Sequence, residues 1–287
     1  MRKAPVKDNR LGNEDRLGTA EVLSLMRRRL FEAALRWLLP ILLIVGWEIG
    51  ARTGVIPARI LPAPSAVARA FWVTLRNGEL VHHTLISTQR AFYGLVIGGG
   101  IGFVLGVING ALPLAAKLTD SSLQMLRSVP HLAAIPLVLL WFGIDESAKI
   151  FLVAIGVAFP IYLNTFHGIR MVDRGLIEMG RIYGLSSLAL YTRVILPGAL
   201  PSILVGLRYA LGIMWLTLIV AETISAQSGL GYMTMNAREF LQTDVVLLGI
   251  IIYALLGKLA DMATRWLERR ALAWHPSFQS RTATVAA

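Results

Sequence analysis

The sequence of 287 residues contains no cysteine and few charged residues. Without cysteine, the chain has no disulfide framework, no thiolate metal ligand and no cysteine nucleophile. Charged residues make up 16% of the chain and apolar residues 55%, and the mean hydropathy is +0.63. A soluble domain has far less apolar sequence, whereas a helix that spans a bilayer needs about 20 mostly apolar residues. The composition therefore predicts an all-α, polytopic membrane protein.

Recognisable catalytic and metal-binding patterns are also missing from the sequence. The histidines His82, His83, His131, His167 and His275 follow no metal-ligand spacing, and Ser, His and Asp form no nucleophile arrangement. A glycine-rich run at 94–110 follows no strand and precedes no Gly-Lys-Ser/Thr, so it is not a nucleotide loop. We therefore expect no catalytic residue, no metal site and no cofactor in this chain.

Six stretches are long and apolar enough to cross a bilayer. They cover about 35–52, 86–110, 123–142, 149–167, 203–225 and 245–266. Basic residues precede the first stretch, as they do in a signal peptide, but no small-residue cleavage site stands out and five more spans follow. We therefore expect the first span to remain uncleaved.

The positions of Lys and Arg predict the topology. With the amino terminus inside, residues 1–34, 111–122, 168–202 and 267–287 would be cytoplasmic, and these segments hold the excess of basic residues that the positive-inside rule requires. The net charge of +11 flanks the spans and forms no single basic face, which argues against a nucleic-acid partner. We expect a cytoplasmic tail at 1–34, a transmembrane domain at 35–267 and a second cytoplasmic tail at 268–287.

The external segment 53–85 contains a Pro-rich stretch that ends at Ser65. Serine is a favourable helix cap, and the residues that follow are amphipathic, so we predict an interfacial helix at 66–77. A plain linker is the alternative.

Three features of the spans predict how the helices pack. Glycines recur every four residues from Gly94 to Gly110, a spacing that makes a smooth groove for another helix. Pro130 and Pro136 interrupt the third span, where a pore-lining segment, a hinge and a structural kink are all open interpretations. Arg90 and Glu222 lie near the outer ends of two spans, where they either pair with each other or reach the headgroups.

The segment between the fourth and fifth spans carries the most informative pattern. The apolar residues Val172, Leu176, Met179 and Tyr183 recur at helical spacing, Gly184 permits a sharp turn, and Ser186 or Ser187 can cap a second short helix that Pro197 ends. This describes a helix-turn-helix knob on the cytoplasmic side that offers a docking face to a partner. A loop helix without a partner is the alternative.

The knob resembles the EAA loop of the permeases of bacterial ABC importers, which reads E-A-A, three residues, Gly, nine residues, I-x-L-P. Glu178, Gly184, Leu196 and Pro197 match this pattern. Met179 and Gly180 replace the two alanines, and valine replaces the isoleucine. The resemblance implies a loop at about 168–202 that couples the permease to an ATPase. Its coupling residues would be Glu178, Met179, Gly180, Gly184, Leu196 and Pro197.

Longer runs extend the resemblance from about residue 35 to 275. They include I60-L-P-A-P-S, R127-S-V-P-H-L-A-A-I-P-L, W141-F-G-I-D-E-S-A-K-I-F-L-V-A, N164-T-F-H-G-I-R, I195-L-P-G-A-L-P-S-I, A221-E-T-I-S-A and N236-A-R-E-F-L-Q-T-D-V-V. They are similar to the aliphatic sulfonate branch of the binding-protein-dependent, type I importer permeases, a family that also serves taurine and nitrate.

The resemblance implies a MetI-like permease fold in the bacterial inner membrane and no enzymatic activity of its own. It also implies a complex of two permease copies, two ATPase subunits that bind ATP and Mg, and a periplasmic sulfonate-binding protein. Taurine, sulfate esters and nitrate are alternative substrates, and an ion-gradient-driven secondary transporter is a more distant alternative. Donors that we expect along the path of a transported anion are Arg90, Asn164 and Trp215, with Glu222 nearby.

Overall fold

The computed structural model describes residues 19–274, and all regular structure in that range is helical. The described residues form two compact units that divide between Ala66 and Val67. The first unit contains α1 (Thr19–Arg52), and the second contains the helices from α3 onward.

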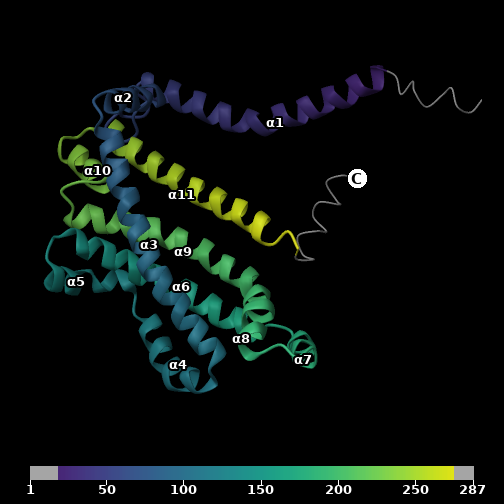
Figure 1. Cartoon of the computed structure of the whole chain (residues 1–287). Coiled ribbons are helices and arrows are strands. Elements are labelled where there is room, and N and C mark those ends of the chain that lie inside the picture. The colour runs from purple at the N-terminus through teal and green to yellow at the C-terminus, as the bar shows by residue number, and fades with distance from the viewer. Residues whose placement is uncertain (1–18, 275–287) are drawn as a thin grey trace, which may run out of the picture. The chain divides into compact units, whose positions relative to one another are not determined.

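The helices follow one another with short connections (Figure 1). After α1 come α2 (Pro64–Arg76), α3 (Glu79–Ala111), α4 (Pro113–Ser128), the short 3₁₀ helix η1 (His131–Ala134), α5 (Ile135–Phe142), α6 (Glu146–Arg170), α7 (Arg174–Ile182), α8 (Ser187–Leu190), the π-helical turn η2 (Tyr191–Ile195), α9 (Leu196–Ser225), α10 (Leu230–Glu239) and α11 (Thr243–Ala271).

Four helical stretches within the described residues are long and apolar enough to span a membrane. These are Glu79–Ala111, Glu146–Arg170, Ser187–Ile224 and Thr243–Ala271. The all-helical class is therefore confirmed. Of the predicted tail at 1–34, residues 1–18 lie outside the described residues, and residues 19–34 form the start of α1. The predicted tail at 268–287 is described only up to residue 274.

The glycine groove of α3 is filled by α6. Gly98 and Gly102 lie against the backbone of Ala154 and Ala158, and a Cβ atom on Gly106 would stand 2.6 Å from Cβ of Thr165. Side chains at these positions would force the two helices apart. The groove predicted from the sequence therefore has its partner within the same chain.

The helix α6 lies at the centre of the second unit, because it packs against both α3 and α9. The largest core cluster contains the buried residues Ala91, Val153, Val157, Ile161, Ala210, Met214 and Leu218. Three long helices, α3, α6 and α9, thus form the core of this unit.

The predicted third span at 123–142 is not one continuous helix. The helix α4 ends at Ser128, Val129 and Pro130 are extended, and η1 then leads into α5. Pro136 lies in the first turn of α5, where a missing N–H costs no hydrogen bond. The interruption therefore lies at Pro130, while Pro136 starts the next helix.

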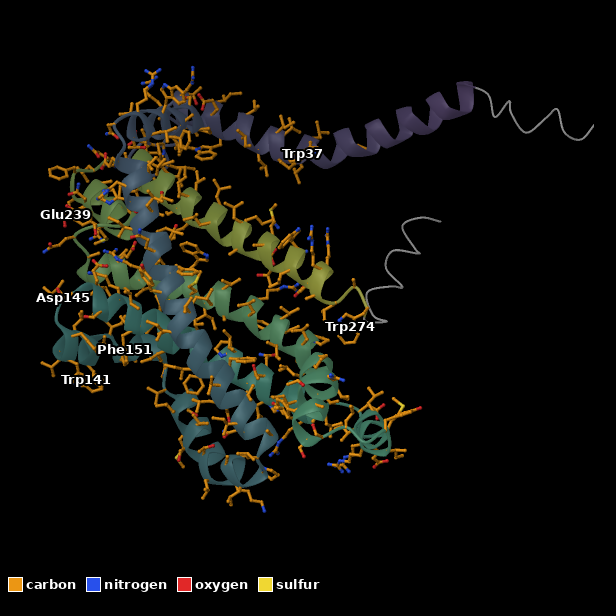
Figure 2. The ribbon with its side chains drawn as sticks, in the orientation of Figure 1. Trp37, Trp141, Asp145, Phe151, Glu239 and Trp274 are labelled. Carbon is orange, nitrogen blue, oxygen red and sulfur yellow. The ribbon has the colours of Figure 1, made fainter. Side chains whose placement is uncertain are left out.

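The apolar end of α5 is open to its surroundings. Trp141 has 61% of its surface exposed, and its side chain points away from the helices beside it (Figure 2). The neighbouring Phe142 instead packs on Phe151 of α6, with 4.8 Å between the ring centroids. The aromatic pair holds α5 against the start of α6.

A helix is present where the sequence predicted an amphipathic one, since α2 covers Pro64–Arg76. The role expected for Ser65 was wrong, because the helix begins one residue before it. Ser65 instead donates from its backbone N and from its hydroxyl to the carboxylate of Glu48, at 3.0 and 2.7 Å.

Candidate functional site

The segment that the sequence predicts as a cytoplasmic knob contains two short helices with a turn between them. Asp173 caps α7 by accepting a hydrogen bond from the backbone N–H of Gly175 at 2.8 Å. Gly184 ends the turn with φ of +74°, a conformation that strains any residue with a side chain. Ser186 then caps α8 by accepting from the backbone N–H of Ala189. The sequence predicted the turn and this cap correctly.

Gly180 brings the two short helices together. It is buried, and a Cβ atom on it would stand 2.6 Å from Cδ1 of Leu190. The EAA pattern has alanine at this position, and glycine allows a closer approach here. The departure from the pattern is therefore explained by packing within the knob.

The outer surface of the knob carries an apolar patch, which we call the knob patch. Its members are large apolar side chains that are between 46% and 85% exposed: Met171, Leu176, Met179, Ile182, Tyr183 and Leu188. Glu178 is also exposed. Val172 is buried instead, packed with Ile169 and Ala199 in a small core cluster.

Pro197 does not end the second helix of the knob, so that prediction was wrong. The chain continues from α8 through the π-helical turn η2 into α9, and residues 187–224 form one long helical stretch. Leu196 donates its backbone N–H to the carbonyl of Tyr191, and Pro197 lies in the first turn of α9. The wider π turn accommodates a proline that would otherwise interrupt the helix. The knob is thus continuous with a core helix.

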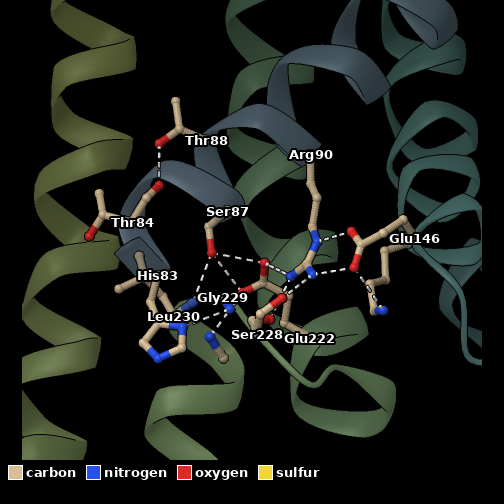
Figure 3. Close-up of polar contacts among 12 residues, drawn as sticks. His83, Thr84, Ser87, Thr88, Arg90, Glu146, Glu222, Ser228, Gly229 and Leu230 are labelled. Carbon is tan, nitrogen blue, oxygen red and sulfur yellow. Dashed lines mark hydrogen bonds and ion pairs between the residues drawn. The ribbon is translucent and has the colours of Figure 1, made fainter. Parts of the chain in front are cut away.

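A second polar site lies at the opposite end of the core helices, where Arg90 of α3 meets Glu222 of α9. Nη1 of Arg90 donates to Oε1 of Glu222 at 2.7 Å, and both residues are buried. Arg90 also makes a two-pronged contact with Glu146 at the start of α6, at 2.5 and 2.6 Å (Figure 3). The pairing of Arg90 and Glu222 that the sequence left open is therefore present.

Every N–H of the Arg90 guanidinium has an acceptor. Besides the two glutamates, it donates from Nη1 to the carbonyl oxygen of Ser228 at 2.7 Å and from Nη2 to its hydroxyl at 2.9 Å. A guanidinium has five N–H donors, and these five hydrogen bonds use all of them. In this conformation Arg90 has no donor left for a transported anion.

Glu222 also accepts hydrogen bonds from α3, α10 and α11. Ser87 of α3 donates to both of its oxygens at 2.8 Å, Tyr253 of α11 donates to Oε2 at 2.7 Å, and the backbone N–H of Gly231 donates to Oε2 at 2.9 Å. A buried carboxylate is stable only when it is paired and hydrogen-bonded in this way. We call Ser87, Arg90, Glu146, Glu222, Ser228 and Tyr253 the outer network.

The outer network also fixes the segment that leads into α10. The backbone N–H of Gly229 donates to Nδ1 of His83 at 3.0 Å, and that of Leu230 donates to Oγ of Ser87 at 2.8 Å. Gly229 has φ of +102°, and a side chain on it would meet Glu222 and Arg90. The glycine is required both by its backbone conformation and by the lack of space.

Asn164 lies apart from the outer network, whereas Trp215 borders it. Asn164 donates to the carbonyl of Pro160 at 2.9 Å and faces Gly206 of α9. Trp215 packs edge-on to Tyr253, with 6.3 Å between centroids, and its buried Nε1 has no acceptor among the residues that the structure describes. Of the four residues expected along an anion path, Arg90 and Glu222 thus belong to the outer network, Trp215 borders it through Tyr253, and Asn164 lies elsewhere.

Sequence reasoning did not find the partners Glu146, Ser87, Ser228 and Tyr253. Glu146 falls just before a predicted span, and the other three are ordinary polar residues in apolar surroundings. The signal that was available is the cost of a buried charge, which predicts that Arg90 and Glu222 need several partners but does not say which ones.

Polar contacts also join the core helices away from the outer network. Arg208 of α9 pairs with Glu268 of α11 and lies 3.9 Å from the carboxylate of Asp261. Asn109 of α3 donates to Thr119 of α4 at 2.7 Å and to the Tyr162 hydroxyl of α6 at 3.0 Å. No group of three metal-ligating side chains is found within the described range.

Comparisons with known proteins give consistent results. The sequence profile of a family described as binding-protein-dependent transport system inner membrane component matches residues 98–272. A protein of Escherichia coli (strain K12) that is named an aliphatic sulfonates transport permease protein, SsuC, is 60% identical over 249 residues, which are 87% of this chain and 95% of that protein.

Two further similarities are more distant. The taurine transport system permease protein TauC of Escherichia coli (strain K12) is 35% identical over 84% of this chain and 89% of that protein. Among solved structures, a chain from the crystal structure of an amino acid ABC transporter with histidines has a TM-score of 0.56 and 18% identity, and the match covers 70% of this chain and 97% of that one. This structural likeness concerns the fold alone.

Proposed function

The chain belongs to the family of binding-protein-dependent transport system inner membrane components, and from this premise we propose that it is the permease subunit that carries aliphatic sulfonates in an ATP-driven importer. The observation that carries the substrate assignment is the difference in sequence identity to two permeases that are named for different substrates. The chain is 60% identical to a protein named for aliphatic sulfonates and 35% identical to one named for taurine. Taurine, sulfate esters and nitrate are the alternatives.

Energy would reach the permease through the knob. The knob patch presents exposed apolar side chains in a basic, polar surrounding, which is how an interface for a partner protein differs from ordinary surface. A movement of an ATPase bound to α7 would be transmitted to α9, because the π turn joins the knob to that core helix. Glu178, Met179, Gly180, Gly184, Leu196 and Pro197 would be the coupling residues. ATP and Mg would be bound by two ATPase subunits and not by this chain.

We infer six membrane crossings, with the third one broken. The crossings would be α1, α3, the combination of α4, η1 and α5, then α6, α9 and α11. Alternation of inside and outside supports this count, because α3 and α6 then both end on the cytoplasmic side, where the knob begins. Both termini would be cytoplasmic.

The working complex would contain two copies of this permease, two ATPases and a periplasmic sulfonate-binding protein, in the bacterial inner membrane. Family membership supports the ATPase and the binding protein as partners. Arg90, Asn164, Trp215 and Glu222 stay as predicted residues of the translocation path. Arg90 and Glu222 would take part only in a conformation that opens the outer network.

Uptake by reconstituted vesicles tests the proposal. The permease, its ATPase and its binding protein are placed in liposomes, and ATP-dependent uptake of labelled ethanesulfonate is measured with taurine and nitrate as competitors. We expect uptake that requires ATP and is inhibited more by alkanesulfonates than by either competitor. Uptake that follows a proton gradient and ignores ATP would instead support a secondary transporter.

A further inference from the structure

The interruption of the third crossing places a histidine among the core helices. His131 follows the extended residues Val129 and Pro130 and begins η1. Its Nε2 lies 2.9 Å from Oγ1 of Thr217 on α9. Its ring also lies against Gly156 of α6, where a Cβ atom would stand 3.3 Å from Cδ2 of the imidazole. The ring is therefore held between α6 and α9.

With the start of α6 and the end of α9 taken as the outer membrane surface, His131 lies near the middle of the bilayer. Gly156 comes ten residues after the start of α6 at Glu146, which is about 15 Å along the helix axis. Thr217 comes eight residues before the end of α9 at Ser225, about 12 Å along that axis. Because the hydrocarbon core is about 30 Å thick, both neighbours place the imidazole far from either surface.

The contact with Thr217 favours one of the two neutral tautomers of His131. Thr217 is fully buried, and within residues 19–274 the only acceptor found for its hydroxyl is Nε2 of His131. A buried hydroxyl in an apolar surrounding donates its hydrogen wherever an acceptor is in reach. We therefore assign the hydrogen of this contact to the Thr217 hydroxyl, which leaves a neutral imidazole with its own hydrogen on Nδ1.

The Nδ1–H group of His131 is an unused donor. No partner for it is found in the described part of the chain, and His131 as a residue is partly exposed. Arg90, which would be the stronger anion ligand, has all five donors occupied at the outer end. The imidazole thus offers a free N–H at membrane depth.

We propose that the Nδ1–H of His131 donates a hydrogen bond to a sulfonate oxygen of the substrate as it passes the break in the third crossing. This inference rests on the proposed sulfonate transport. A neutral donor suits a transit site, because binding must be strong enough for entry and weak enough for release. A permanent positive charge at this depth would need a counter-ion and would hold the anion longer.

Two substitutions at position 131 separate the donor from the shape of the ring. His131→Phe keeps a ring of similar size but removes the N–H, whereas His131→Gln keeps a donor. We expect ethanesulfonate uptake per ATP hydrolysed to fall about three- to tenfold in the phenylalanine variant, the value of one hydrogen bond, and to stay within about twofold of wild type in the glutamine variant. His82→Phe, an exposed histidine on α3, is the matched control.

Stimulation of ATP hydrolysis by the loaded binding protein should be unchanged in all variants, which separates a transit contact from a folding defect. Equal transport per ATP in wild type and His131→Phe would overturn the inference while leaving the proposed function intact. If the wild-type complex carries a different oxyanion and no sulfonate, the proposed function fails. The same variants are then compared on that anion, since the donor serves any such oxygen.

The tautomer can be measured without transport. Solid-state NMR of the ¹⁵N-histidine-labelled wild-type protein in lipid, with His131→Gln used to assign the signal, should show a protonated Nδ1 and an unprotonated Nε2. Addition of ethanesulfonate should shift the Nδ1 signal and not the signals of His82. The opposite tautomer, or an Nδ1 signal that the anion leaves unchanged, would contradict the proposal.

Discussion

Replacing Arg90 with methionine removes the only positive charge that lies against the buried carboxylate of Glu222 among the described residues. The methionine fills much of the same volume, so the main effect is electrostatic. Removal of one partner from a buried ion pair costs about 3–5 kcal/mol, because the other charge stays buried and unpaired. Here Glu222 keeps the donors Ser87, Tyr253 and Gly231.

The second carboxylate should add little to this cost. The side chain of Glu146 is 58% exposed and already lies 3.5 Å from Lys149, so it can turn toward water. We therefore expect the lower end of the range, about 3 kcal/mol. At about 2–4 °C per kcal/mol, the midpoint of thermal unfolding should fall by roughly 6–12 °C.

The assay is thermal unfolding of the purified permease in detergent, followed by the loss of monodisperse protein after heating. The double variant Arg90→Met with Glu222→Gln removes the stranded charge, and it should recover more than half of the lost stability. Arg238→Met is the matched control, since this arginine is exposed on α10 and should change stability by no more than about 0.5 kcal/mol. An Arg90→Met protein as stable as wild type, or a double variant no better than the single one, would refute the electrostatic reasoning.

Four other substitutions test the packing and the knob. Gly98→Ala should separate α3 from α6 and lower the unfolding temperature. Gly100 lies on the same helix, but a Cβ atom there would meet nothing within 4 Å, so Gly100→Ala should be neutral or stabilise the protein by up to about 1 kcal/mol. Thermal unfolding in detergent compares the two variants. Gly184→Asp adds a side chain at φ of +74° and a charge to the turn, so copurified ATPase or uptake per ATP should fall, and normal coupling would contradict a role for this turn. Ile182→Asp in the knob patch, where the side chain is 85% exposed, should leave stability within about 0.5 kcal/mol but reduce ATPase copurification at least tenfold; unchanged copurification would place the partner elsewhere.

The sequence predicted the elements whose signals are local. Helical spacing, a turn glycine and a serine cap all lie within a few residues of one another, so the amino-acid pattern was sufficient to predict the knob helices. The course of α9 could not be predicted in this way, because a π turn depends on how a whole helix accommodates Pro197, and the proline alone predicts a stop. The same limit explains Ser65, whose hydroxyl found an acceptor in Glu48 on the preceding helix.

Contacts between distant segments were predictable in kind but not in identity. The glycines of α3 required a close neighbour, and α6 does carry small residues at a spacing of four, Ala154 and Ala158. That pattern was a usable signal for the partner, though small residues are common in any apolar helix. The buried charge of Arg90 likewise required compensation. Its partners Glu146 and Glu222 lie 56 and 132 residues further along the chain, and no local sequence pattern connects them to it.

The two polar sites in the core helices differ in a way that bears on transport. At the outer end, a full positive charge is cancelled by two carboxylates and every donor is used, so the arrangement stabilises one conformation and binds no anion in it. At the break between α4 and α5, His131 is partly exposed, and the Nδ1–H donor that we propose for it has no partner among the described residues. A pathway for an anion needs donors that are available yet weak, and a closed end needs charges that are fully paired. The residues that attract attention in the sequence by their charge are therefore the ones that hold the outer end together, whereas the better candidate for touching the substrate is a neutral histidine.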